Sequence, residues 1–146
     1  MPKATFAARY ENLARICEFV STNAKSAGLD DSAAYAVELA TNEAATNIIE
    51  HAYGGEGDGK IECAIEADDH VVTVVLRDWG EPFDASKVPQ PDFSVPLEEL
   101  SIRGAGLRLI RGSMDEVEFE PVPGGGNRLT MRKTVRKGDR APAPSE

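Results

Sequence analysis

The amino-acid sequence predicts an α+β fold built as a two-layer α/β sandwich, in which helices cover one face of a mixed, mostly antiparallel sheet. Two long segments before residue 53 have the apolar spacing of helices, and the segments after residue 60 are short, apolar and separated by turns. Each such element is apolar on one side, so stacking the helices on the sheet buries both apolar sides. A length of 146 residues suits one domain, which we expect over residues 1–135.

The first predicted elements are an edge strand and a helix. Residues 4–9 predict the short edge strand. The helix follows from about Tyr10 to Ala27, and Gly28 ends it. Its apolar residues recur at the three- and four-residue intervals of a helix; they are Leu13, Ile16, Cys17, Val20 and Ala24.

A second predicted helix has Asp30 or Asp31 as its N-cap and runs to about Ala52. The glycine-rich segment 54–59 ends it in a turn. Its buried stripe is rich in alanine, which allows close packing against a sheet. The stripe consists of Ala33, Val37, Ala40, Ala44 and Ile48.

The predicted strands follow this turn. Residues 60–67 alternate between apolar and polar, and residues 71–76 are rich in β-branched side chains, as in a central strand. Asp68 and Asp69 form a turn between them, so the two segments predict a hairpin. Two closing strands are expected at residues 117–119 and 129–131; the latter has the pattern Leu-Thr-Met.

Three further segments complete the chain. Residues 79–103 are rich in proline and irregular, which is typical of a functional lid or of disorder. A short helix is expected from Gly106 to about Met114. Residues 136–146 are polar and rich in proline, so we expect a disordered tail.

Composition restricts the classes of function. The formal net charge of −9 argues against a nucleic-acid surface, which needs concentrated Lys and Arg. The sequence has no apolar run of about 18 residues and no secretory signal that we recognise, so we expect no membrane span. Cys17 and Cys63 lie in apolar helix and strand patterns, which predicts reduced core thiols in a cytoplasmic protein.

Two groups of polar residues are candidates for chemistry. Glu43, Asn47 and His51 are four residues apart and therefore share one helical stripe, which borders the alanine stripe. That position suits either the lining of a cleft or a solvated polar edge. Asp78 ends the strongest strand, and Gly80 comes two residues later. A carboxylate there can accept a hydrogen bond from an amino group such as that of adenine, or the segment is a plain strand-end turn.

Two glycine-rich turns complete the pattern. Gly104 and Gly106 open the short predicted helix, a context in which backbone N–H groups can face phosphate. Arg103 is the nearest cation for β- and γ-phosphates, with a solvated surface charge as the other reading. The second turn, Gly124 to Gly126 followed by Asn127, leads into the last strand and also suits an ordinary hairpin.

The order of these four signals resembles the GHKL ATPase superfamily (the Bergerat fold), which holds DNA gyrase, histidine kinases and the anti-sigma factor kinases. The compact length points to the last branch. Residues 43–53 look very like the N-box of anti-sigma kinases, and the likeness continues through residues 103–119. It covers roughly residues 5–135, nearly the whole chain.

The resemblance implies a site for ATP and Mg²⁺. Asn47 would supply an oxygen to Mg²⁺, and Glu43 would be the general base that takes a proton from a protein hydroxyl or positions a water. Asp78 would accept a hydrogen bond from the exocyclic amino group of adenine. Gly80 would let the base approach the backbone, and Thr130 would lie under adenine. The other matching residues that we assign to the nucleotide site are His51, Arg103, Gly104, Gly106 and Leu107.

The implied function is that of an ATP-dependent anti-sigma factor. It would bind a sigma factor, phosphorylate a Ser or Thr of an anti-anti-sigma protein, and form a homodimer. The alternative is a nucleotide-binding partner-switch module without phosphotransfer, in sigma control or in another signalling complex. A sensor histidine kinase is disfavoured because His51 and His70 are the only histidines and no coiled-coil helix precedes the domain. A gyrase-type or mismatch-repair-type ATPase would need a second domain.

Overall fold

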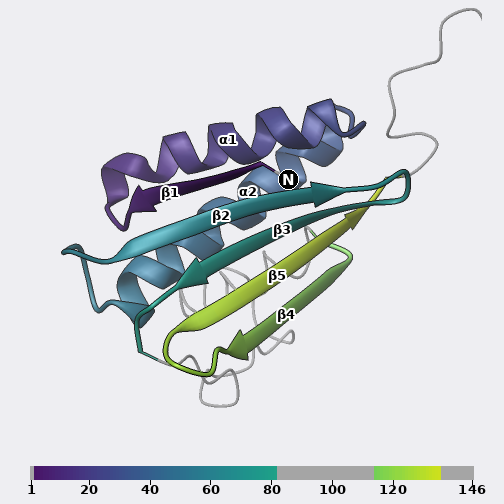
Figure 1. Cartoon of the computed structure of the whole chain (residues 1–146). Helices are drawn as coiled ribbons and strands as arrows, with labels where there is room; N and C mark the ends of the chain where they lie inside the picture. The colour runs from purple at the N-terminus through teal and green to yellow at the C-terminus, as the bar shows by residue number, and fades with distance from the viewer. Residues whose placement is uncertain (1, 82–113, 136–146) are drawn as a thin grey trace, which may run out of the picture.

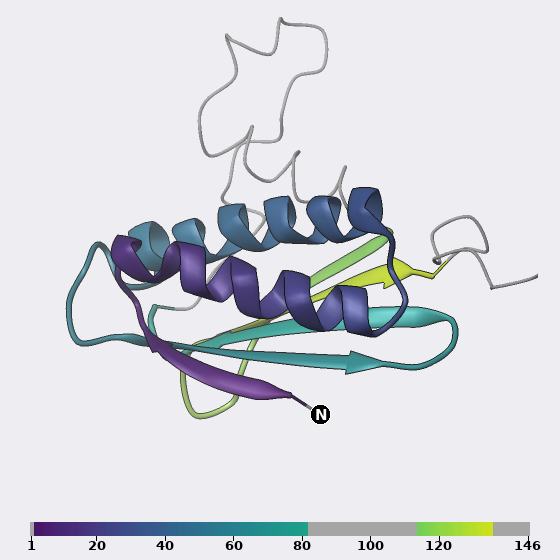
Figure 2. The same ribbon diagram turned by 90° about the horizontal axis from the view of Figure 1, so that it is seen from above.

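The computed structural model of the chain describes residues 2–81 and 114–135, in which five strands form one antiparallel sheet with helices on one face (Figures 1 and 2). The strands are β1 Lys3–Ala7, β2 Lys60–Ala67, β3 Val71–Asp78, β4 Glu116–Pro121 and β5 Asn127–Thr134. The helices are the 3-10 turn η1 Tyr10–Asn12, α1 Leu13–Ser26, α2 Asp31–Asn47 and the π-helix η2 Ile48–Ala52. The predicted two-layer fold is confirmed.

The sheet has the strand order β1-β2-β3-β5-β4. Each of the neighbouring pairs among these strands is antiparallel. The predicted hairpin is β2 and β3, and its turn depends on Asp68, whose Oδ1 accepts hydrogen bonds from the backbone N–H groups of His70 (2.7 Å) and Val71 (2.8 Å). β3 has a strand on each side, which is the central position that its β-branched sequence predicts.

The helix boundaries follow from their capping groups. Asp30 is the N-cap of α2, where its Oδ1 accepts a hydrogen bond from the backbone N–H of Ala33 at 2.8 Å. Gly28 has a φ of +112°, a left-handed conformation that ends α1 and reverses the chain. Both helices then lie side by side over the sheet (Figure 2).

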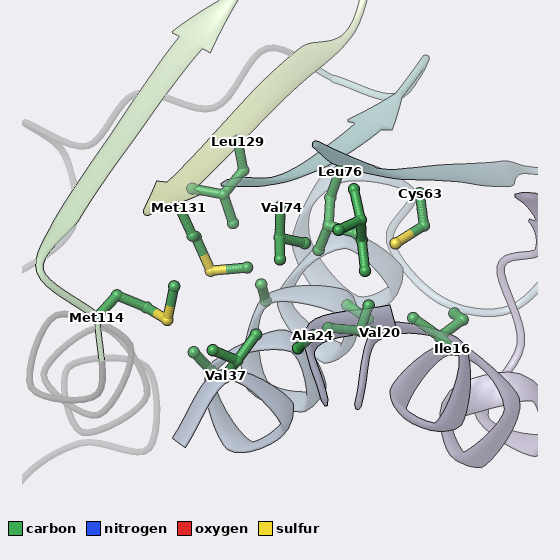
Figure 3. Packing of buried hydrophobic residues seen from close by; sticks show 14 of the residues in the cluster. Ile16, Val20, Ala24, Val37, Cys63, Val74, Leu76, Met114, Leu129 and Met131 are labelled. Carbon is green, nitrogen blue, oxygen red and sulfur yellow. The ribbon is translucent and has the colours of Figure 1, made fainter. Parts of the chain in front are cut away.

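The core lies between the helices and the sheet. Figure 3 shows Ile16 and Val20 of α1 facing the sheet residues, among which Leu76 and Met131 are fully buried. Each side chain of this size contributes about 1.5–3 kcal/mol when it leaves water. Met114, the first described residue after the gap, is 5% exposed and belongs to the same cluster.

The two cysteines are part of this core. Cys17 and Cys63 are buried and free, as predicted. Burial raises the pKa of the Cys17 thiol to about 11 and that of the Cys63 thiol to about 12. Both thiols are therefore protonated and poor nucleophiles at neutral pH.

The structure differs from the sequence-based boundaries at two places that matter for the site. The second helix changes to a π-helix at Ile48, whose carbonyl accepts from the N–H of Tyr53, five residues later, at 3.1 Å. β5 begins at Asn127, before the predicted start at Leu129, whereas β3 ends at Asp78, as predicted.

Most of the predicted lid and short helix lie outside the described residues, as does the predicted tail. None of the helices in residues 2–81 and 114–135 is long and apolar enough to cross a membrane.

Candidate functional site

Asp78 is a buried carboxylate at the end of the central strand. Its side chain lies on the helix-covered face of the sheet, and the residue is 2% exposed. Its Oδ1 accepts hydrogen bonds from the backbone N–H of Gly80 at 2.9 Å and from Nδ2 of Asn127 at 3.0 Å. Burial raises the pKa of Asp78, while these hydrogen bonds and the charge of Arg77 oppose part of the rise. The result is a desolvated hydrogen-bond acceptor held in one orientation.

The turn after Asp78 is pressed against the end of the second helix. A Cβ atom on Gly80 would lie 2.6 Å from the carbonyl carbon of Ala52 and 2.9 Å from its Cβ, and closer still to its carbonyl oxygen. The next residue, Glu81, donates its backbone N–H to that oxygen at 2.7 Å. Only glycine fits at position 80, and the turn and η2 therefore form one unit.

The opposite side of Asp78 is formed by the turn that enters β5. Gly126 has a φ of +83°, and a Cβ there would lie 2.6 Å from Cα of Trp79 and would also collide with the Asp78 carbonyl. Arg77 donates to the Asp78 carbonyl and to the Gly125 carbonyl (3.0 Å). Its guanidinium lies 4.6 Å from the centre of the Trp79 ring, as in a cation–π contact. Together these contacts hold the ends of β3 and β5 side by side.

A small cavity of about 30 Å³ lies between these turns and the second helix. Its polar lining comes from Asn47, Asp78 and Asn127; the rest of the lining is apolar and consists of Ala44, Ile48, Ala52, Phe119 and Leu129. A space of this volume admits ordered water. A purine ring is larger, so it would have to lie across the mouth of the cavity or widen it.

The three polar residues predicted on the second helix lie where the spacing indicated, beside the buried stripe. Glu43, Asn47 and His51 are partly exposed, whereas their neighbours in the alanine stripe are buried. Asn47 lines the cavity, but Glu43 and His51 do not. At the end of the helix it is Ala52 rather than His51 that faces Asp78.

Thr130, which was predicted to lie under adenine, lies away from Asp78 in this structure. Thr130 pairs with Val75, so both side chains lie on the sheet face opposite to Asp78. Asp78 pairs directly with Asn127, the first residue of β5, and the two share the helix-covered face. Asn127 is the residue of β5 that reaches the candidate site.

The remaining predicted residues divide by position. Gly80 lies in the site with Asp78 and Asn47. Arg103, Gly104, Gly106 and Leu107 lie outside the described residues, and their assignment to the nucleotide site stays a prediction.

Two residues at this site lie within the sequence motifs but were given no role by the sequence analysis. Asn127 donates through Nδ2 to Asp78 and also to the Glu81 carbonyl at 2.8 Å. The sequence contained a signal for Asn127, because this residue directly follows the glycine turn. A strand that begins there lies opposite the end of β3. Tyr53 donates its hydroxyl to the Lys60 carbonyl at 2.7 Å and accepts from the N–H of Trp79 at 2.9 Å. No short-range pattern indicates that long-range contact.

The donors and acceptors at this site fit an adenine nucleotide. A buried carboxylate can accept a hydrogen bond from an amino group, and the glycines at positions 80 and 126 let the two neighbouring turns pack closely around it. Asn47 adds an amide within the same lining, and amide oxygens are ligands that Mg²⁺ accepts alongside phosphate oxygens.

The sequence of this chain is similar to those of known proteins. The family described as histidine kinase-like ATPase domain matches residues 6–133. An anti-sigma F factor of Bacillus velezensis is 32% identical over 102 residues, which cover 69% of this chain and 69% of that protein. A serine-protein kinase RsbW of Bacillus cereus is 36% identical over 87 residues, which cover 57% of this chain and 54% of that protein.

A solved structure supports the fold. The RsbU and RsbW domains of a Mycobacterium tuberculosis protein superpose with a TM-score of 0.59 at 16% identity, covering 97% of this chain and 35% of that one. At this identity the likeness concerns the fold alone.

Proposed function

This chain belongs to the histidine kinase-like ATPase family, and on that premise we propose that it is an ATP-dependent anti-sigma factor with protein serine/threonine kinase activity. Its relatives named anti-sigma F factor and serine-protein kinase support this choice within the family. The proposed partners are a sigma factor and an anti-anti-sigma protein, with a homodimer as the proposed assembly in the cytoplasm.

The observation that carries the nucleotide site is the setting of Asp78. Its carboxylate is buried, held by hydrogen bonds on Oδ1, and bordered by Gly80 and Gly126, where no other residue fits. A base whose amino group meets this carboxylate would be recognised by a desolvated, oriented acceptor. Such an acceptor selects adenine over guanine, because guanine presents a carbonyl at the corresponding position of the ring.

Phosphate chemistry is proposed for the helix that faces Asp78. Asn47 would hold Mg²⁺ through its amide oxygen, and the bound ion would neutralise charge on the phosphates. Glu43 lies one helical turn before Asn47 and is partly exposed, so a substrate hydroxyl can reach it. Glu43 would accept the proton as the Ser or Thr oxygen forms its bond to the γ-phosphorus, and the bond from that phosphorus to the ADP oxygen breaks.

The phosphorylated anti-anti-sigma protein would then leave, and the sigma factor would remain bound to this chain. The sigma factor and the anti-anti-sigma protein would compete for this chain. Whether the sigma factor is bound or free would therefore depend on ATP.

A phosphotransfer assay with Glu43→Gln tests the kinase proposal. With γ-phosphate-labelled ATP and an anti-anti-sigma protein, we expect a loss of about 10²- to 10⁴-fold in rate and an unchanged Kd for ATP. Glu38→Gln, on the same helix and also partly exposed, is the matched control and should retain the wild-type rate. Full transfer by Glu43→Gln would remove the general base from this account and leave a nucleotide-binding switch as the function.

A further inference from the structure

Tyr53 joins three parts of the chain through one hydroxyl group. It follows the π-helix η2, and its OH donates to the Lys60 carbonyl at 2.7 Å. The same oxygen accepts from the backbone N–H of Trp79 at 2.9 Å and from that of Lys60 at 3.3 Å. A phenol offers one donor and two acceptor sites, so these contacts use its full capacity.

The aromatic ring of Tyr53 has little freedom to move. A Cβ atom on Gly59 would lie 2.7 Å from ring atoms Cδ1, Cε1 and Cζ of Tyr53, so the backbone of Gly59 packs directly against the ring. The ring also packs against the hydrophobic core. The position of the hydroxyl is therefore set by packing on both sides.

Tyr53 and its neighbour Ala52 hold the turn that follows Asp78. The Tyr53 hydroxyl binds the N–H of Trp79, and the Ala52 carbonyl binds the N–H of Glu81 at 2.7 Å. Gly80, which lies between Trp79 and Glu81 in the chain, is in contact with Ala52. Its own N–H bonds to the Asp78 carboxylate. Movement at Trp79 would therefore move both the carboxylate and its nearest donor.

We propose that Tyr53 is a positioning residue of the nucleotide site, which holds the Asp78 carboxylate in register with the second helix by fixing the backbone of Trp79. This inference rests on the proposed function. It adds a second role to the helix that carries Glu43 and Asn47: the end of that helix sets the geometry of base recognition through Tyr53.

If Tyr53 only stabilised the fold, its replacement by phenylalanine would give a different result. The contacts of the Tyr53 hydroxyl with Trp79 and Lys60 are on the exposed side of the protein, so water can replace the hydroxyl in Tyr53→Phe at a small cost in stability. A positioning role instead predicts weaker nucleotide binding in a fully folded protein, with local loosening at the turn.

The experiment compares Tyr53→Phe with Tyr35→Phe in the full chain. Tyr35 lies on α2, is 63% exposed, and forms no hydrogen bond through its hydroxyl with the described residues. The Kd for ATP is measured by calorimetry with Mg²⁺ below the unfolding transition of each variant. Hydrogen exchange of the Trp79 amide is measured in parallel, and Trp79, the only tryptophan, reports the same turn by fluorescence.

We expect Tyr53→Phe to bind ATP roughly five- to tenfold more weakly, since a single hydrogen bond that holds the turn is lost. The Trp79 amide should exchange faster, the KM for ATP should rise, and kcat should change little. Tyr35→Phe should match the wild type in every respect. A wild-type Kd for Tyr53→Phe, or an equal loss in Tyr35→Phe, would overturn the inference while leaving the proposed function intact.

A second variant tests the same contact without removing the hydroxyl. Gly59→Ala places a methyl group against the Tyr53 ring and should weaken ATP binding by displacing the hydroxyl from Trp79. Gly57→Ala, where a Cβ meets nothing within 4 Å, is its control. Wild-type affinity in Gly59→Ala would count against Tyr53 even if Tyr53→Phe proved too unstable to study. Absence of ATP binding by the wild-type protein would instead contradict the proposed function.

Discussion

Replacing Gly80 by alanine should disrupt both the stability and the nucleotide affinity of the protein. The added Cβ would lie 2.6 Å from the carbonyl carbon of Ala52 and 2.9 Å from its Cβ, whereas carbon atoms pack at about 3.5–4.0 Å. The neighbouring atoms are mostly backbone, so the turn itself has to move by roughly 1 Å to restore that separation. The φ angle of Gly80 is not among the positive ones, so the cost is steric rather than conformational.

The magnitude follows from two contributions. Forcing an extra methyl group into a packed site costs about 1–3 kcal/mol. Moving the turn also weakens the hydrogen bond from the Glu81 N–H to the Ala52 carbonyl, which is worth about 0.5–1.5 kcal/mol. We therefore expect the free energy of unfolding to fall by about 2–4 kcal/mol, and the Kd for ATP to rise at least about tenfold, because Asp78 is displaced with the turn.

Urea unfolding and calorimetric titration with ATP measure the two effects. Gly57→Ala is the matched control, because its Cβ would enter open space and its φ is also not positive. That substitution should be neutral or stabilising by up to about 1 kcal/mol. If Gly80→Ala is as stable as Gly57→Ala and binds ATP equally well, the close packing of the turn on η2 does not hold the site.

Three further results are expected. Asp78→Asn should raise the urea midpoint of the free protein at pH 7, because burial raises the pKa of Asp78 and its ionised form therefore costs stability above that pKa. The difference in urea midpoint between the variant and the wild type should shrink as the pH falls through this pKa. A difference that stays constant with pH would contradict this expectation. The affinity for ATP should decrease as Asp78 becomes protonated, starting at a higher pH than for an ordinary aspartate, in titrations across pH 4–7. Iodoacetamide should label Cys17 and Cys63 at least about tenfold more slowly in the native protein than in urea, since burial raises both thiol pKa values; equal rates would show that the thiols are accessible.

The elements that position Asp78 were predictable because their patterns are local. The β-branched run of β3 and the alanine stripe of α2 each indicate their secondary structure and buried side within a few residues. Asp78 and Gly80 are adjacent to such a run, so their place at a strand end also followed.

The register of β5 was not predictable from a local pattern. Asn127 and Arg128 are polar and continue no apolar alternation, so the strand was expected to start at Leu129. The pairing of Asp78 with Asn127 depends on the turn and on the length of both strands. Because side chains alternate between faces, this register places Thr130 on the opposite face from Asp78.

The contacts of Tyr53 were hidden for a related reason. Its hydroxyl partners lie 7 and 26 residues away in the chain, and its position depends on the π-helix that follows Asn47. A π-helix is a short, single-turn variation of a longer α-helix, and the spacing of apolar residues alone does not distinguish the two.

Calorimetric titration of the wild-type protein and of Asp78→Asn with ATP and Mg²⁺, with GTP as the competing nucleotide, tests whether Asp78 recognises the base. We expect saturable binding of ATP by the wild type, much weaker binding of GTP, and a loss of roughly 10- to 100-fold in ATP affinity for Asp78→Asn. Equal affinity of both proteins for ATP, or no discrimination against GTP, would show that Asp78 does not read the base.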